Sequence, residues 1–188
     1  MPRPLDRRIP TPRRARRGLG SLGLLLVLSC GPQGGSATPK DGGEGSGGLD
    51  LSLPNVDGEF VTPTATSDHD VFVLAFWATW CQPCQQELTK MNGMYASRKD
   101  RGLQIFAVSI DGPDTAAQVG PWVEREGYQF PVLLDRETQV LTRYNPRGDI
   151  PYYVVLDARG RVLKDHQGYM TGDMEELEAF LDSVLPAG

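Results

Sequence analysis

Metal-ligating residues are scarce in this chain of 188 residues, which has only three cysteines and two histidines, His69 and His166. His69 lies in a polar stretch, and both histidines are expected at the protein surface. Methionine, a soft ligand suited to copper, is not clustered in the sequence. The sequence therefore predicts no bound metal and no cofactor.

Positive charge is also scarce once the N-terminal segment is set aside. Residues 1–29 contain seven arginines and one aspartate, which leaves 12 basic and 23 acidic side chains in residues 30–188. Such an acidic protein has no net electrostatic attraction to the phosphate backbone of nucleic acid. It would also be repelled by anionic lipid, so any attachment to a membrane must come from a lipid anchor.

The apolar stretch at residues 19–29 is too short to span a bilayer. It follows the arginines, and together they predict a signal peptide over residues 1–29. The end of this stretch, Val27-Leu28-Ser29-Cys30, looks like a lipobox, so Cys30 is predicted to be lipidated and the protein to lie outside the cytoplasm. The alternative is an ordinary secretory signal in which Cys30 has no role.

Two segments follow the predicted signal peptide. Residues 30–48 start at Cys30 and are dominated by glycine, serine and proline, so they predict a flexible linker. Residues 49–188 have the length of one compact domain and contain no internal repeat.

The segment at residues 71–87, VFVLAFWATWCQPCQQE, combines a strand pattern with a helix pattern. Residues 71–76 are apolar and predict a central buried strand. Apolar side chains then recur with helical spacing at Cys84, Leu88, Met91 and Tyr95. Cys81 is therefore expected at the turn between strand and helix, with Pro83 in the first helical turn.

This position favours redox chemistry at the two cysteines. The positive end of a helix stabilises a thiolate, which is the reactive form of cysteine. A C-x-x-C pair between a strand and a helix is typical of thioredoxin-like redox motifs. We expect Cys81 to be the exposed attacking sulfur and Cys84 the shielded resolving sulfur. If Cys30 carries lipid, these two cysteines pair with each other and no odd thiol remains.

The sequence LAFWATWCQPCQQEL resembles thioredoxin-like proteins of the TlpA and ResA type, and the resemblance extends over residues 49–188. It implies an α/β thioredoxin-like fold, with a mixed sheet flanked by helices and an added N-terminal β-hairpin. It also implies a thiol–disulfide oxidoreductase that faces the outside of the inner membrane, commonly a reductant in cytochrome c maturation. The chain has Ala75 where thioredoxin has a buried acid, so Glu87 becomes the candidate proton carrier.

The resemblance also assigns substrate-binding residues. It identifies Pro151 as a cis-proline that faces the two cysteines, and a cis X–Pro bond costs little. The backbone of Ile150 would then be free to pair with an extended substrate strand. Trp80 is expected to cover the sulfur and, with Pro83, to shape the docking surface.

The remaining patterns predict the other elements of the domain. A turn at Asp57-Gly58 predicts an N-terminal hairpin, and residues 103–110 predict the next strand. The helix after it is capped by Asp114, is kinked at Pro121 or begins there, and closes at Gly127. The elements expected beyond it are a strand at residues 130–135, a short helix at 140–144, a hairpin over 152–163 and a closing helix capped at Asp173.

Several alternatives remain open at this level. Glu87 is either the proton carrier or a solvated surface residue, Trp122 packs in the core or contacts substrate, and residues 130–144 are structural or select substrates. The protein itself is either an oxidoreductase or a thioredoxin-fold copper-binding lipoprotein, with a peroxidase ranked last. As an oxidoreductase it would exchange disulfides with exported thiol-bearing or disulfide-bonded proteins, and the resemblance favours a reductant recharged by a membrane electron donor.

Overall fold

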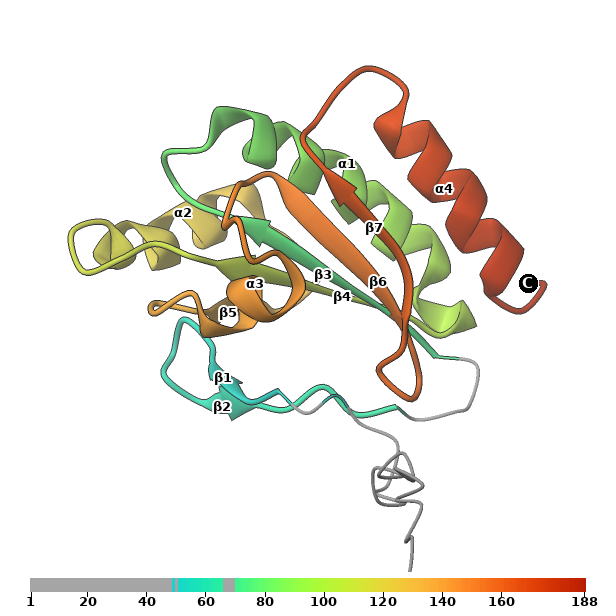
Figure 1. Ribbon diagram of the computed structural model, residues 1–188, viewed down its shortest axis with the longest axis horizontal. Helices are drawn as coiled ribbons and strands as arrows, with labels where there is room; N and C mark the ends of the chain where they lie inside the picture. The colour runs from blue at the N-terminus through green and yellow to red at the C-terminus, as the bar shows by residue number, and fades with distance from the viewer. Residues whose placement is uncertain (1–48, 50, 66–69) are drawn as a thin grey trace, which may run out of the picture. The chain divides into compact units, whose positions relative to one another are not determined.

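The computed structural model describes residue 49, residues 51–65 and residues 70–188 (Figure 1). The predicted signal peptide, the lipidation at Cys30, the linker and the surface position of His69 lie outside the described residues. Within the described part of the chain, no helix combines the length and the apolar character that crossing a bilayer requires.

A five-stranded mixed sheet forms the centre of the domain (Figure 1). The central strand pairs in parallel with one neighbour and antiparallel with the other. All seven of its residues are buried, as expected for a strand covered on both faces. In spatial order the strands are β5 (Val132–Leu134), β4 (Leu103–Ser109), β3 (Val71–Trp77), β6 (Tyr152–Asp157) and β7 (Val162–Gln167).

Three helices cover one face of this sheet: α1 (Gln82–Arg98), α2 (Val119–Glu126) and α4 (Asp173–Val184). Because side chains alternate along a strand, Val73, Ala75 and Trp77 all point to this face. Cys84 and Leu88 of α1 pack in the same cluster, which we call the sulfur face.

An ion-pair network joins the first and last of these helices. Arg98 of α1 is mostly buried, and its Nε donates to Asp182 Oδ1 of α4 at 2.9 Å. Its Nη2 donates to Glu178 Oε1 at 2.8 Å and to Asp182 Oδ2 at 2.7 Å. The hydrogen bond from Arg98, assisted by one from Arg101, lowers the pKa of Asp182 to about 2.

The opposite face has a lighter cover. It consists of the hairpin β1 (Leu53–Pro54) and β2 (Phe60–Val61), together with the short helix α3 (Gln139–Tyr144). The predicted hairpin and short helix are therefore confirmed. An isolated bridge between Asn55 and Leu133 connects the hairpin to the edge of the sheet.

The second helix begins differently from the prediction. A short 3₁₀ turn, η2 (Ala116–Gln118), leads directly into α2, and no side chain caps either element. The predicted cap at Asp114 is wrong. Pro121 lies in the first turn of α2, where its missing N–H needs no partner. Gly127 ends the helix in the left-handed conformation, as predicted.

The closing helix also departs from the predicted capping pattern. Gly172, with a φ of 99°, occupies the N-cap position of α4, and Asp173 is the first helical residue. The carboxylate of Asp173 accepts the backbone N–H of Met170 and pairs with His166, so it faces back toward β7. Glycine adopts this left-handed conformation at little cost. Because Gly172 occupies the N-cap position, the carboxylate of Asp173 can bind Met170 and His166 instead of capping the helix.

Candidate active site

The two cysteines are joined by a disulfide at the start of α1, as the sequence predicts. Cys81 is the N-cap residue in an extended conformation, and Cys84 lies one turn into the helix with its Cα 5.3 Å away. Pro83 occupies the first turn, where a helix has no use for a backbone donor. The local sequence thus places both sulfurs at the positive end of a 17-residue helix.

The exposure of the sulfurs differs from the prediction. Cys84 is fully buried, and Cys81 is only 5% exposed in the disulfide form. The expectation of an exposed Cys81 is therefore wrong for this state, although Cys81 is the more accessible of the two. Trp80, directly before it, is 62% exposed, so its large apolar side chain faces solvent beside the motif.

A buried carboxylate that the sequence analysis missed holds the turn before the cysteines. Asp111 Oδ2 accepts the backbone N–H of Thr79 at 2.9 Å, and Oδ1 accepts the Thr79 hydroxyl at 2.6 Å. Ser109 also donates to Asp111, at 2.9 Å. Adjacent parallel strands end at the same edge of a sheet, so the acidic residue after the strand at 103–110 was a usable signal.

The cis-proline prediction is confirmed, because the Ile150–Pro151 peptide bond is cis. Since β6 runs antiparallel to β3, with Tyr152 paired to Phe76, this bond lies at the end of the sheet where the cysteine motif begins. The carbonyl of Pro151 accepts the N–H of Gly168 at 2.8 Å. Among the described residues, none forms a hydrogen bond with the backbone of Ile150.

Glu87 is fully buried on α1, three residues after Cys84. Neither of its carboxylate oxygens has a hydrogen-bond partner among the described residues. Burial, and secondarily the charge of Asp173, raises the pKa of Glu87 to about 8. The alternative of a solvated glutamate is therefore wrong, and this carboxyl group is mostly protonated at pH 7.

His166 is not the simple surface residue that was expected. Its Nε2 lies 2.9 Å from Asp173 Oδ2, and its ring stacks on Tyr153 at 5.3 Å. The side chain is 25% exposed. Across the residues that the structure describes, no group of three histidine, cysteine or acidic side chains is arranged to hold a metal ion.

The two tryptophans on the sulfur face pack against each other. Trp77 is fully buried and Trp122 is 9% exposed, with their ring centroids 4.6 Å apart. Core packing of both side chains is thus confirmed, as predicted for Trp77 and favoured for Trp122 over substrate contact.

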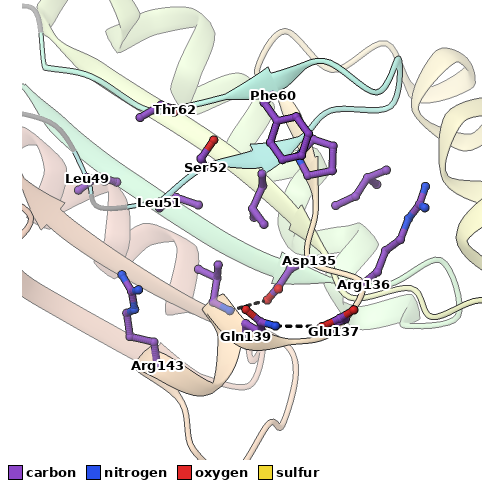
Figure 2. A pocket seen from close by; sticks show the side chains of 14 residues that line it. Leu49, Leu51, Ser52, Phe60, Thr62, Asp135, Arg136, Glu137, Gln139 and Arg143 are labelled. Carbon is purple, nitrogen blue, oxygen red and sulfur yellow. Dashed lines mark hydrogen bonds between the residues drawn. The ribbon is translucent and has the colours of Figure 1, made fainter.

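A cavity of about 480 Å³ lies on the opposite face, between the N-terminal hairpin and α3 (Figure 2). Its lining includes Leu51, Phe60 and Val140, and the charged side chains of Arg136 and Glu137. Leu51 and Val140 belong to the core cluster of that face, whereas both cysteines belong to the cluster of the sulfur face. Seven residues of segment 130–144 line this cavity, the first being Leu134 and the last Arg143.

The fold and the disulfide together define the class of thioredoxin-fold thiol–disulfide oxidoreductases. The model of the AhpC/TSA family matches residues 45–165, and the chain belongs to this family. Curated relatives are named thiol–disulfide oxidoreductase ResA. The relative from Geobacillus thermodenitrificans (strain NG80-2) is 35% identical over 142 residues, which cover 76% of this chain and 78% of the relative.

A second ResA relative, from Geobacillus kaustophilus (strain HTA426), is 38% identical over 113 residues. That alignment covers 60% of this chain and 62% of the relative, which is less than two thirds of its length. Among solved structures, a candidate thiol:disulfide interchange protein DsbE from Chlorobium tepidum is similar at a TM-score of 0.61 and 31% identity. The match covers 71% of this chain and 92% of that one.

Proposed function

We propose that this protein is an extracytoplasmic reductant, anchored to a bacterial membrane by lipid on Cys30, that reduces disulfides in exported proteins. Cytochrome c maturation is the pathway we propose for it, with a membrane protein as its electron donor. The observation that carries the proposal is the Cys81–Cys84 disulfide at the start of a helix, backed by the buried Glu87, which is protonated while the disulfide is closed. The ResA name of the curated relatives supports the same chemistry.

In the forward reaction the reduced protein is the electron source. The Cys81 thiolate attacks one sulfur of the partner's disulfide, which breaks that bond and releases a partner thiolate. Cys84 then gives its proton to the Glu87 carboxylate and attacks the Cys81 sulfur. This step forms the Cys81–Cys84 bond and releases the second partner thiolate, so the partner gains two electrons and this protein loses two.

The reverse half of the cycle restores the dithiol. A donor thiolate attacks Cys81, and Cys84 leaves with the electron pair of the broken S–S bond. A thiolate leaving into an apolar cluster is costly, so a proton from Glu87 favours this step. A second donor thiol resolves the mixed disulfide and becomes oxidised. Glu87 is thus left as the carboxylate that the forward reaction requires.

Partner binding would use the open backbone next to the cis-proline. The unpaired backbone of Ile150 suits the addition of an extended partner segment. The exposed ring of Trp80 and the neighbouring Pro83 offer an apolar contact beside the sulfurs. These features would present the disulfide of an exported protein to Cys81.

The test combines a redox potential with covalent trapping. A potential more negative than that of the exported partner disulfides is expected, and a value as oxidising as that of DsbA, about −120 mV, would overturn the role of reductant. A Cys84→Ser variant should hold partners as mixed disulfides through Cys81. The matched control, Cys81→Ser, removes the attacking sulfur and should hold none. Labelling of Cys30 with a palmitate probe, lost in Cys30→Ser, tests the anchor.

A further inference from the structure

A row of three paired residues connects the centre of the sheet to its edge beneath the buried glutamate. Ala75 of β3 pairs with Tyr153 of β6, and Tyr153 pairs with His166 of β7. Directly opposed residues point to the same face of a sheet, so this Ala75–Tyr153–His166 row lies on the sulfur face. Glu87 of α1 lies close enough to this row for its charge to act on Tyr153.

The outer end of the row meets the start of the closing helix. His166 stacks on Tyr153 at 5.3 Å, and its Nε2 is 2.9 Å from Asp173 Oδ2. The same oxygen accepts the backbone N–H of Met170. Asp173 is only 16% exposed, and two neighbours thus hold its carboxylate against the outer end of the row.

The carboxylate of Asp173 is the charge on α4 that acts on Glu87. Burial opposes its ionisation, but the Met170 amide and His166 outweigh burial and hold the pKa of Asp173 below its ordinary value. The negative charge of Asp173 adds to burial in raising the pKa of Glu87. Both acids also act on Tyr153, whose pKa rises because of burial and then because of these charges.

Glu176 and Asp165 are further acids near the row, and both act on Tyr153. Lys164 Nζ lies 2.6 Å from Glu176 Oε1, so the ammonium group offsets that carboxylate. The neighbour of Asp173 is a histidine instead of a lysine, and it carries a positive charge only when it is protonated. From β3 only apolar side chains reach this face, and at the start of α1 both cysteine sulfurs are held in the disulfide.

We propose that Asp173, held in place by His166, is a positioning residue for the buried Glu87: its carboxylate adds a negative charge that, together with burial, favours the protonated acid while the disulfide is closed. This inference rests on the proposed reaction, in which protonated Glu87 supplies the proton that Cys84 needs when the S–S bond breaks. Asp173 touches neither sulfur and acts only through the charge that it presents to Glu87. The reaction then depends on a helix start that lies far from the cysteines in the sequence.

A carbon-13 NMR titration of the glutamate carboxyl groups in the oxidised protein tests this directly, with Glu87→Gln identifying the signal. In the wild-type protein the Glu87 signal should titrate near pH 8. Asp173→Asn keeps the shape and the acceptor for Met170 but removes the charge, so the midpoint should fall by roughly one pH unit. Asp173→Glu should bring the midpoint back toward the wild-type value.

Glu176→Gln is the matched control, because it removes the same charge three residues further along α4. Its midpoint should stay within about 0.2 pH units of wild type. A midpoint that does not move in Asp173→Asn, or that moves equally in Glu176→Gln, would overturn the proposal. The titration needs no partner protein, so its result is independent of the role as a reductant.

Reduction by dithiothreitol connects this titration to the chemistry. With less Glu87 protonated at pH 7.5, Asp173→Asn should be reduced about threefold more slowly than the wild type, and no more slowly at pH 6. A Glu87→Gln variant should show no further effect of Asp173→Asn. If the NMR midpoint falls but the rates do not change, Asp173 tunes Glu87 without serving the exchange, and the proposal fails. If Glu87→Gln alone leaves the rate unchanged, the proton transfer in the proposed function fails instead.

Discussion

Each face of the sheet buries an acidic side chain, but the two carboxylates differ in their hydrogen-bond partners. On the opposite face Asp135 is 2% exposed, and its Oδ2 accepts the backbone N–H groups of Val140 and Leu141 at 3.0 and 2.9 Å. On the sulfur face Glu87 is fully buried, and its oxygens have no partner among the residues described. Similar burial therefore anchors a helix start in one place and raises the pKa of a carboxyl group in the other, because only Asp135 has donors that replace water.

The covers of the two faces differ as well. Three helices close the sulfur face, whereas a two-stranded hairpin and a six-residue helix leave a cavity of about 480 Å³ on the other (Figures 1 and 2). A closed apolar cover excludes water, and exclusion of water is what shifts the pKa of Glu87. The disulfide and Glu87 thus lie on the better-packed face and not on the face with the cavity.

The largest expected effect is on activity and concerns the sulfur face alone. Cys81→Ser should reduce the disulfide-exchange rate to the uncatalysed level, because it removes the only sulfur that a partner can reach at the motif. Phe60→Ser, at the rim of the cavity, should retain the wild-type rate. Reduction of a fluorescent model disulfide measures both. A comparable loss in Phe60→Ser would show that the cavity takes part in the exchange.

Core substitutions compare how well the two faces are packed. Leu88 and Leu141 are both fully buried, one on each face. Leu→Ala should cost about 2–5 kcal/mol of unfolding free energy at either site, with Leu141 toward the lower end because the nearby cavity lets its face relax. Urea denaturation of the oxidised protein measures both values. A larger loss at Leu141 would contradict the comparison.

The pH dependence of the unfolding free energy should change when Glu87 is substituted but not when Asp135 is substituted. The pKa of Glu87 is higher in the folded protein than in the unfolded chain, so folding binds an extra proton between the ordinary carboxyl range and pH 8. Its contribution to stability is complete below the ordinary carboxyl pKa and is lost as the pH rises, at up to about 1.4 kcal/mol per pH unit. Above about pH 8 the loss is complete.

Glu87→Gln should remove this slope, so the variant gains stability relative to wild type as the pH rises from 5 to 8 by roughly that amount per unit. Asp135→Asn is the control on the other face and should not remove the slope. Urea denaturation across this pH range gives the comparison. Parallel curves for wild type and Glu87→Gln would show that Glu87 is not held protonated.

The smallest effect is expected at the exposed hairpin. Phe60 is 74% exposed, so Phe60→Ser should change the unfolding free energy by no more than about 0.5 kcal/mol. Thermal unfolding of the oxidised protein suffices to measure it. A loss of several kcal/mol would mean that the hairpin cover stabilises the opposite face far more than its exposure indicates.

Much of the fold could be predicted because its signals are local. The run at residues 71–76 and the helical spacing after Cys84 identified the central strand and the first helix almost to the residue. The glycine at position 127 marked a helix end, since few other residues adopt its left-handed conformation. Resemblance to a known family supplied the cis-proline, which no local pattern near Pro151 would have distinguished from an ordinary strand entry.

The errors fall where contacts between different elements of the fold decide the outcome. Asp111 and Thr79 are separated by 32 residues, and their hydrogen bonds form only because the parallel strands before them end side by side. Asp173 fits a helix-capping pattern, yet the fold gives that position to Gly172 and turns the carboxylate toward His166. The expected exposure of Cys81 failed for the same reason, because burial depends on the whole surrounding structure.

The amino-acid sequence by itself determined the strand–turn–helix unit and the pairing of its two cysteines, because hydrophobic periodicity and helix-start chemistry act over a few residues. Only the tertiary structure decided that Glu87 is excluded from water and has no hydrogen-bond partner among the described residues. It also decided that Asp173, at the start of the last helix, supplies the charge that acts on Glu87. Burial and electrostatic fields are summed over everything that surrounds a group, so they exist only once distant segments have packed together.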